Sequence, residues 1–304
     1  MEIEAKILTP EDVLLSCDIE DYPEGIIIPI DKPYRWTSAD VIRKVKFAAI
    51  RHFGKKNLKV GHAGTLDPLA TGVLLVCIGK ATKLAETLQA HDKEYVAGIT
   101  FGATTPSYDL EKEIDRFFPH EHITEMSVKE ALPAFIGEQN QIAPLFSAKS
   151  VDGVRAYELA RKLHKEGRTL DEAAEELIRV SRINITELEL IAFEEGGQCH
   201  RGLENNHSDS FGAGPSPRCE DTSVSKASAR INVTDNSGLG LPRAVVRMAC
   251  SKGTYVRAFA RDLGEALDSG AHLDSLQRSR SGIFRVEDSL TVDQAVALLQ
   301  AGDR

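Results

Sequence analysis

Residues 61–80 read GHAGTLDPLATGVLLVCIGK, and this stretch decides the fold. Its apolar run at residues 73–78 predicts a buried strand. Pro68 disfavours the helical region at the residue before it, so Asp67 sits on an extended or turn backbone. A single acid on a stiff turn beside a core strand is a common way to present one reactive group, although Asp67 can also serve only as a turn cap.

The same stretch carries a family resemblance. Residues 61–74, GHAGTLDPLATGVL, resemble the active-site motif of the bacterial TruB family, the transfer RNA pseudouridine synthases. The resemblance implies that Asp67 is the catalytic residue. It also implies an α+β fold, a pseudouridine-synthase-type catalytic domain with a central, mostly antiparallel mixed sheet flanked by helices and loops.

Local patterns predict the elements around this motif. Thr37 or Ser38 is expected to cap a helix whose apolar face begins at Val41. In the turn before it, Trp36 stands where the family usually has a glycine. Strands are predicted at residues 25–30, 95–101, 183–193 and 244–250, and helices at 84–88, 129–135, 154–165, 256–264 and 292–299.

Length and composition indicate one large domain, or one domain with an appendage. The chain has 304 residues, 42% of them hydrophobic, which is enough for a sizeable core. Its five cysteines form no CxxC pair, and Cys199, His200, His207 and Cys219 are poorly spaced for zinc. We therefore expect neither a disulfide framework nor a metal site. Because no signal peptide or long apolar segment is present, a cytoplasmic protein is predicted.

The order of segments along the chain predicts an interrupted domain. Residues 1–24 form an acidic N-terminal extension, and residues 25–300 form the catalytic domain. Within it, residues 195–242 are rich in Gly, Ser, Asn and Pro, which predicts a disordered insertion, with a folded subdomain as the alternative. Because only four residues follow Gln300, we expect no C-terminal RNA-binding PUA domain of the kind that some family members carry.

The net charge of −9 argues, by itself, against a nucleic-acid partner, but its distribution is more informative. Residues 41–59 contain no acid and directly precede the Asp67 loop. The stretch predicts a phosphate-contacting face, with a merely solvated helix face as the alternative. Its basic residues are Arg43, Lys44, Lys46, Arg51, Lys55, Lys56 and Lys59.

Further active-site residues follow from the resemblance. Residues 250–257, CSKGTYVR, are similar to a family motif whose arginine pairs with the catalytic aspartate, so Arg257 is expected to keep Asp67 ionised. In the family, the tyrosine that corresponds to Tyr95 stacks on the target base. Tyr255 is expected to hydrogen-bond or to assist deprotonation, and Leu276 to form a hydrophobic wall of the pocket.

RNA contacts are expected from the same motif, from the basic stretch and from neighbouring segments that resemble the family. His62 is a candidate wedge for the space that an extracted base vacates. The remaining residues assigned to RNA binding or base flipping are Lys32, Arg43, Lys44, Lys83, Asp109 and Lys149.

The reaction that the resemblance implies is a cofactor-free isomerisation. The N1–C1′ bond of uridine breaks and is remade through C5, with Asp67 attacking either C1′ of the sugar or C6 of the ring. The implied substrate is position 55 in the T loop of the transfer RNA T arm. No cofactor, metal or membrane is expected, and we expect a monomer. The alternatives are a transfer RNA-binding or folding module in which catalysis is dispensable, and a synthase that acts on a different RNA uridine.

Overall fold

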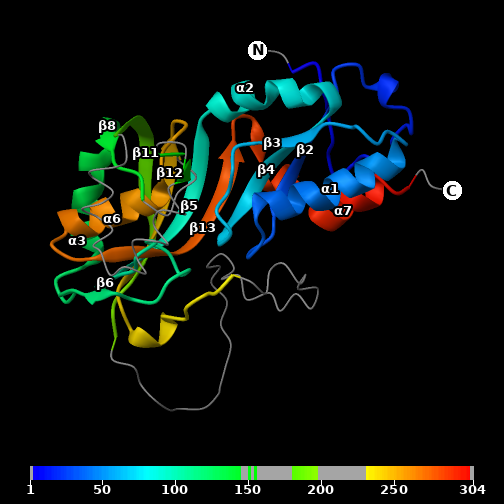
Figure 1. Ribbon diagram of the computed structural model, residues 1–304. Coiled ribbons are helices and arrows are strands. Elements are labelled where there is room, and N and C mark those ends of the chain that lie inside the picture. Colours follow the sequence, from blue (N-terminus) through cyan, green and yellow to red (C-terminus); the bar gives the residue numbers. More distant parts are fainter. Residues whose placement is uncertain (1–2, 145–149, 152–153, 156–179, 198–230, 302–304) are drawn as a thin grey trace.

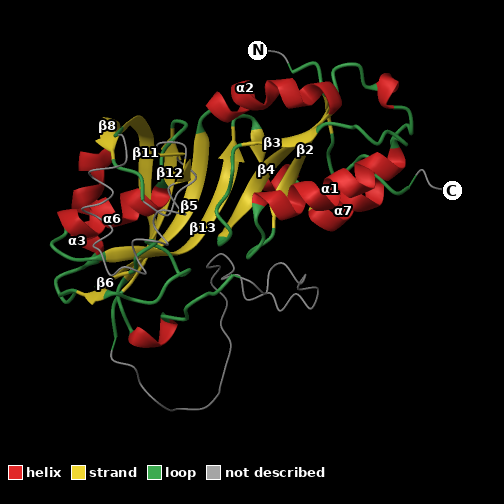
Figure 2. Ribbon diagram, viewed as in Figure 1, coloured by secondary structure: helices red, strands yellow, loops and turns green. Residues whose placement is uncertain are grey.

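The computed structural model describes residues 3–144, 150–151, 154–155, 180–197 and 231–301. In this part of the chain, eleven strands form one sheet with the path β1-β2-β4-β13-β5-β12-β11-β8 (Figures 1 and 2). The strands on the path are β1 (Lys6–Ile7), β2 (Ile26–Lys32), β4 (Ala70–Ile78), β13 (Ala271–Ser281), β5 (Lys93–Phe101), β12 (Arg243–Cys250), β11 (Ser181–Glu194) and β8 (Gly137–Gln141). Beside the path lie β3 (Val60–Ala63), β14 (Phe284–Arg285) and β15 (Leu290–Thr291), and separate two-stranded sheets are formed by β6 (Ala103–Thr104) with β7 (Arg116–Phe117) and by β9 (Ser150–Val151) with β10 (Val154–Arg155).

Most neighbouring strands of the large sheet are antiparallel. Among the described residues, the parallel pairs are β1 with β2, β15 with β2, and β13 with β4. This mostly antiparallel mixed sheet, flanked by helices and loops, confirms the predicted α+β fold. The parallel pair matters for function because it places Leu276 of β13 opposite Ala70, which directly follows the Asp67 turn.

The helices gather at the two ends of the sheet. Figure 1 shows α1 (Ser38–His52) beside α7 (Val292–Leu298) at one end, and α3 (Glu125–Ala131) and α6 (Val256–Ala266) at the other. The short α2 (Ala85–Ala90) lies next to β3. None of the helices in the described ranges has the length and apolar character that crossing a membrane requires.

The apolar interior is divided into two main clusters that meet in the middle of the sheet. One contains side chains of β2, β4, α1 and α7, and the other contains side chains of β5, β11, β12 and α6. Tyr95 of β5 and Leu276 of β13 pack against both clusters. The centre of the sheet, where these two residues lie, is therefore a seam between the two apolar clusters.

The start of α1 has the N-cap that the sequence predicts, but the turn before it differs at one residue from what we expected. Thr37 is the N-cap and forms a capping box with Asp40, since each side chain accepts from the other residue's backbone amide. The residue with a left-handed backbone is Arg35, at φ 62°. Trp36, which we expected at the position of the family's glycine, is therefore not the residue that requires a glycine-like conformation.

The other predicted elements are largely present. The strands at 25–30, 95–101, 183–193 and 244–250 correspond to β2, β5, β11 and β12, and four of the helices to α1, α2, α6 and α7. The helix predicted at 129–135 starts earlier, as α3, and continues as the 3-10 turn Leu132–Phe135. Of the helix predicted at 154–165, residues 156–165 lie outside the described ranges, and the first two residues form strand β10 instead.

Parts of the N-terminal extension and the C-terminal end of the predicted insertion make contacts with the folded domain, which we did not expect. In the 1–24 segment, β1 pairs with β2, and Leu8 and Leu15 are buried in the core. Residues 198–230 of the predicted insertion, with the four Cys and His residues considered as metal ligands, lie outside the described ranges. Its described end is held in place, because the Thr234 amide donates to the Leu110 carbonyl at 2.8 Å.

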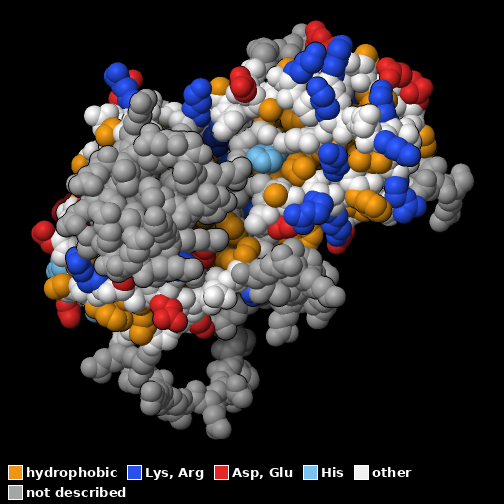
Figure 3. All heavy atoms as spheres, viewed as in Figure 1, with side chains coloured by type: hydrophobic (Ala, Val, Ile, Leu, Met, Phe, Trp, Pro, Cys, Tyr) orange, Lys and Arg blue, Asp and Glu red, His pale blue; other side chains and the backbone are white. Residues whose placement is uncertain are grey.

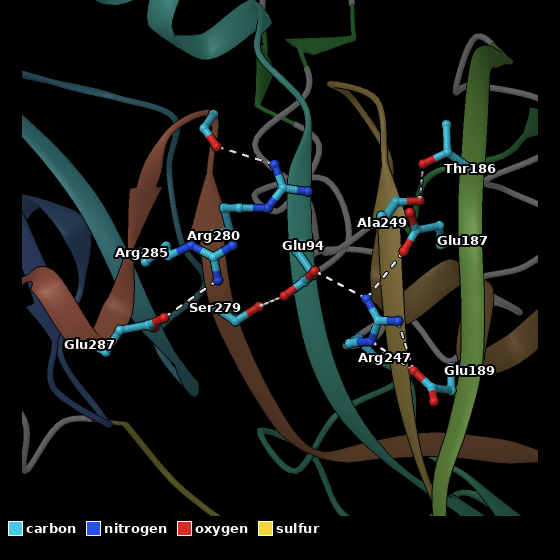
Figure 4. A network of polar contacts seen from close by, with 11 residues as sticks. Glu94, Thr186, Glu187, Glu189, Arg247, Ala249, Ser279, Arg280, Arg285 and Glu287 are labelled. Carbon is cyan, nitrogen blue, oxygen red and sulfur yellow. Dashed lines mark hydrogen bonds and ion pairs between the residues drawn. The ribbon is translucent and has the colours of Figure 1, made fainter.

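A polar network on one face of the sheet fixes the register of its central strands (Figure 4). Arg247 of β12 lies within 3.3 Å of Glu94 on β5 and also pairs with Glu187 and Glu189 on β11. Glu94 in turn accepts a hydrogen bond from Ser279 of β13 at 2.7 Å. Because successive side chains of a strand alternate, Tyr95 projects to the opposite face from Glu94.

Candidate active site

Asp67 lies on the turn between β3 and β4, and its side chain is 40% exposed. The turn closes through a hydrogen bond from the Ala70 amide to the Asp67 carbonyl at 3.1 Å. Ser38, at the start of α1, holds the preceding residue, because its hydroxyl accepts from the Leu66 amide at 3.0 Å and donates to the Leu66 carbonyl at 3.2 Å. Ser38 thus holds the backbone next to Asp67, while the Asp67 carboxylate remains partly exposed to solvent.

Arg257, near the start of α6, is the main partner of this carboxylate. Its Nε atom lies 2.9 Å from Oδ2 of Asp67, and its side chain is only 6% exposed. Burial acts against a charged guanidinium, but the negative charges of Asp67 and Asp109 hold the pKa of Arg257 above its usual value. Arg257 is therefore a permanent cation beside Asp67, and the structure brings together the pair that the sequence motif implied.

Asp109 lies on the far side of the same guanidinium. Its Oδ2 atom is 3.6 Å from Nη1 of Arg257, which also donates to the Ser107 carbonyl at 3.1 Å. The other oxygen of Asp109 accepts from the Ser107 hydroxyl at 2.6 Å and from the Glu111 amide at 3.0 Å. The carboxylate of Asp109, which we expected to contact RNA, is thus held beside Arg257 by Ser107 and the Glu111 amide.

A pocket opens at the seam of the sheet, and Asp67 and Asp109 lie in its wall. Leu276, which we expected to form a hydrophobic wall, is one of its apolar lining residues. The residues that line the pocket are Asp67, Leu69, Ala70, Asp109, Leu110, Arg257, Leu273, Asp274, Ser275 and Leu276. The Asp67 carboxylate, the Arg257 cation and a hydrophobic wall therefore share one pocket.

Tyr95 lies next to this pocket, on the neighbouring strand, without lining it. It is the cross-strand partner of Arg278 of β13 and is half-buried. Burial raises the pKa of Tyr95, and the positive charge of Arg278 acts in the opposite direction. Its hydroxyl therefore stays protonated near neutral pH, and its ring remains beside the seam.

Two further predicted residues border the site. Tyr255 is the N-cap of α6, and its backbone is held at both ends by the side chain of Gln141, at 2.8 and 3.1 Å. His62 lies half-buried on β3, and burial together with the charge of Arg278 lowers its pKa. A neutral imidazole at this position suits a wedge between bases better than a phosphate contact.

The structure corrects the role that we assigned to Lys32. Its side chain is fully buried, and Nζ donates to the carbonyls of Pro33, Trp36 and Pro68 at 2.9, 2.6 and 3.2 Å. Burial lowers the pKa of Lys32 to about 7, although the charge of Asp67 acts in the opposite direction. Lys32 thus anchors the Asp67–Pro68 turn and cannot reach an RNA phosphate.

The basic residues that we assigned to RNA lie on the surface around α1. Arg43 pairs with Asp40 at 2.8 Å, and Lys44 pairs with Asp293 at 2.6 Å, while Lys83 is exposed. Lys149 falls outside the described residues. Figure 3 shows lysine and arginine side chains spread over the half of the molecule that carries α1. A shallow hollow there is lined by Lys46, Lys56, Asn57, Leu58, Lys59, Val60, Gly61 and Thr82.

Two residues of the site were not identified from the sequence. Arg278 is buried beneath the Asp67 loop, yet in the printed sequence it is one of two arginines in Arg278-Ser279-Arg280 and looks like a surface residue. Its burial could have been inferred from its spacing of two from Leu276 on a strand. Gly72, the other residue, has φ 95°, and a Cβ there would lie 2.2 Å from the Arg278 carbonyl oxygen.

We therefore expect Gly72→Ala to destabilise the fold strongly. The substitution combines a left-handed backbone with a backbone clash, so the free energy of unfolding should fall by about 3 kcal/mol or more. Gly54→Ala is the matched control, because Gly54 also has a positive φ but nothing lies within 4 Å of its Cβ position. Gly54→Ala should lower the free energy of unfolding by only about 1 kcal/mol. Chemical denaturation measures both values, and equal losses would show that the close approach to β13 is unimportant.

The chain is similar to known proteins over most of its length. The model of the TruB family pseudouridylate synthase, N-terminal domain, matches residues 51–203. Among curated proteins, the chain is 45% identical to a tRNA pseudouridine synthase B of Phocaeicola vulgatus, over 90% of this chain and 92% of that protein. A protein of the same name from Flavobacterium johnsoniae is 38% identical over 90% of this chain and 95% of its own length.

Solved structures share the fold at lower identity. A chain in the crystal structure of a Cbf5-Nop10-Gar1 complex has a TM-score of 0.56 and 22% identity, and the match covers 99% of this chain. A chain in the structure of an H/ACA RNP bound to a substrate RNA containing 2'-deoxyuridine has a TM-score of 0.51, 21% identity and 91% coverage. This chain spans only 62% and 54% of their lengths, so the likeness concerns the fold alone.

Proposed function

This chain belongs to the TruB family of pseudouridylate synthases, and we propose that it isomerises the uridine at position 55 in the T loop of transfer RNA, with Asp67 as the nucleophile. The observation that carries the proposal is the pairing of a partly exposed carboxylate with a buried cation. Asp67 is the accessible member, and Arg257 is held behind it by Ser107 and Asp109. Such an arrangement keeps an anion available to a ligand while water contacts only one side of it.

The reaction requires an anion that forms and then releases a covalent bond. In the proposed mechanism, an oxygen of Asp67 adds either to C1′ of the ribose or to C6 of the uracil ring. The N1–C1′ bond breaks, the base turns, and C5 replaces N1 at C1′. The C5 proton then leaves, N1 takes up a proton, and the carboxylate is free again, so the net reaction needs no other reactant. Arg257 stabilises the carboxylate at the start and at the end of this cycle.

Access to C1′ or C6 requires that the uridine leave its stack. Enzymes that act on a base in structured nucleic acid extrude the nucleotide into a pocket. We propose that Leu276 contacts the extracted ring, that the face of Tyr95 supports it, and that neutral His62 fills the vacated space. The lysines of the hollow beside Gly61 would contact the RNA backbone, which offsets the net charge of −9 locally.

The proposal is tested by following the hydrogen at C5. Transfer RNA transcribed with uridine tritiated at C5 should release one tritium per molecule when it is incubated with the protein, because C5 loses its hydrogen during the isomerisation. A transcript in which only the T-loop uridine is replaced by cytidine should release none above background. Release from both transcripts would show a different target, and release from neither would contradict the activity.

We expect the ring of Tyr95, rather than its hydroxyl, to carry most of its contribution. Base–aromatic stacking is worth about 1–3 kcal/mol, so Tyr95→Leu should lower kcat/KM by roughly 5- to 150-fold. Tyr95→Phe keeps the ring and should stay within about fivefold of the wild type. The measurement is multiple-turnover kinetics on a T-arm stem-loop. If Phe were as inactive as Leu, the hydroxyl of Tyr95 rather than its ring would be the essential group.

A further inference from the structure

Arg278 is a buried guanidinium that the mechanism above does not use. It is 2% exposed and heads the fully buried side chains when they are ranked by volume. Within the described ranges, no carboxylate lies at ion-pair distance from it. A buried charge without a counter-ion is costly to a fold unless its hydrogen-bonding capacity is fully used. The location of the hydrogen-bond acceptors of Arg278 therefore indicates the role of this side chain.

Those acceptors lie on both sides of the catalytic turn. Nη2 of Arg278 donates to the Gly64 carbonyl at 3.2 Å and Nη1 to the Thr65 carbonyl at 3.5 Å, both before Asp67. Nε donates to the Val73 carbonyl at 2.7 Å, after the turn. The planar guanidinium of Arg278 thus bridges the two ends of the loop that carries Asp67.

The same side chain also contacts the aromatic residue of the site. Arg278 and Tyr95 are directly opposite each other on the antiparallel strands β13 and β5, so their side chains lie on one face. The positive charge of the guanidinium lowers the pKa of the Tyr95 hydroxyl, against the larger effect of burial. Arg278 therefore has contacts with both the loop of Asp67 and the residue next to the extracted base, whereas Arg257 contacts the carboxylate itself.

We propose that Arg278 is a positioning residue that sets the Asp67 loop relative to the ring of Tyr95, so that the nucleophile and the extracted base meet at reacting distance. The proposal rests on the proposed function. Displacement of a reacting group by about 1 Å can reduce a rate about a hundredfold without weakening ground-state binding. Arg278 would thus affect the chemical step although it touches neither the carboxylate nor the substrate.

The test compares variants of Arg278 with a matched arginine on the same strand. Arg278→Met should lower the single-turnover rate about a hundredfold, while the Kd for a T-arm stem-loop stays within about threefold. Arg278→Lys keeps a cation that reaches only some of the carbonyls, and its rate should lie between those of Met and wild type. Arg280→Met is the control, because Arg280 donates to the Gly282 carbonyl at 3.1 Å and has no contact with the loop.

Two readouts separate positioning from general destabilisation. In hydrogen exchange, amides of residues 64–70 should exchange faster in Arg278→Met, while those of β11 and β12 remain unchanged. In a double-mutant cycle, Tyr95→Phe should lower the rate in the wild type but have no further effect in Arg278→Met. If Arg278→Met does not fold, the same two readouts are applied to Arg278→Lys.

A rate for Arg278→Met, or for Arg278→Lys in its place, that equals the rate of Arg280→Met would overturn the proposal. So would additive effects of Arg278 and Tyr95, or accelerated exchange throughout the sheet. Failure of this proposal differs from failure of the proposed function, because the wild type and Arg280→Met would then still isomerise the RNA. Inactivity of those two proteins would contradict the function itself.

Discussion

Asp67→Asn should abolish isomerisation and leave transfer RNA binding within about threefold of the wild type. The amide has nearly the shape of the carboxylate and keeps an oxygen near Arg257, which lies 2.9 Å from Oδ2 in the native protein. It has no charge and cannot form the covalent bond. We expect a loss of at least about a thousandfold in the single-turnover rate, equivalent to about 4 kcal/mol. The measurement is tritium release from C5 under single-turnover conditions.

The control is a carboxylate outside the pocket. Asp288, exposed in the 3-10 turn Val286–Asp288, can be changed to Asn with the same loss of charge. The single-turnover rate of Asp288→Asn and its Kd for transfer RNA should match those of the wild type. If Asp67→Asn kept more than about a hundredth of the wild-type rate, Asp67 would not be a covalent catalyst.

Arg257 should show the second largest effect. The guanidinium serves three acceptors, Asp67, Asp109 and the Ser107 carbonyl, in three directions. Arg257→Met leaves two carboxylates close together without a cation, and we expect a rate loss of about a thousandfold or more. Arg257→Lys restores a charge but not the planar fork, so about a hundredfold loss should remain. Single-turnover rates and Kd values for a T-arm stem-loop separate this loss from a loss of binding.

Stability gives an independent readout for the same residue. Removing one partner from a buried ion pair typically costs about 3–5 kcal/mol, because the other charge stays buried. Asp109, whose side chain is 9% exposed, is the carboxylate that would be left in this state. Arg257→Met should therefore unfold at lower denaturant than wild type, and Arg257→Met combined with Asp109→Asn should recover part of the loss. An unchanged midpoint in Arg257→Met would mean that the pair is unimportant to the fold.

The parts of the fold that local patterns determine could be predicted from the sequence. The apolar run after Gly72 is β4, and the Thr37 N-cap begins α1. The resemblance of two short motifs, 190 residues apart in the sequence, was enough to pair Asp67 with Arg257. Each of these inferences depends either on residues that are adjacent in the sequence or on two motifs whose contact in space the family resemblance implies.

Burial of two charged side chains was not predicted from the sequence. Lys32 looks like a surface cation, but it follows Ile28 and Ile30 at a spacing of two on β2, and all three are buried. Arg278 follows Leu276 in the same way on β13. Alternation places these cations on the inward face, yet only the three-dimensional structure shows the carbonyls that satisfy them.

Contacts between distant segments that carry no family motif could not be predicted. The pairing of β1 with β2 depends on residues 20 positions apart, as in Lys6 with Ile26. The contact of Thr234 with Leu110 joins a segment that follows β5 to a segment that precedes β12, 124 positions later in the sequence. Such pairings depend on the closed structure of the whole domain, because neither partner carries a local signal for the other.

The most direct measurement is to map the modified nucleotide in an unmodified transfer RNA transcript. After incubation with the protein, carbodiimide treatment and primer extension should give one new stop, at position 55 of the T loop, and Asp67→Asn should give none while still binding the transcript. A stop at another uridine, or no stop with wild-type protein that binds the transcript, would contradict the assignment of this pocket as a T-loop uridine isomerase.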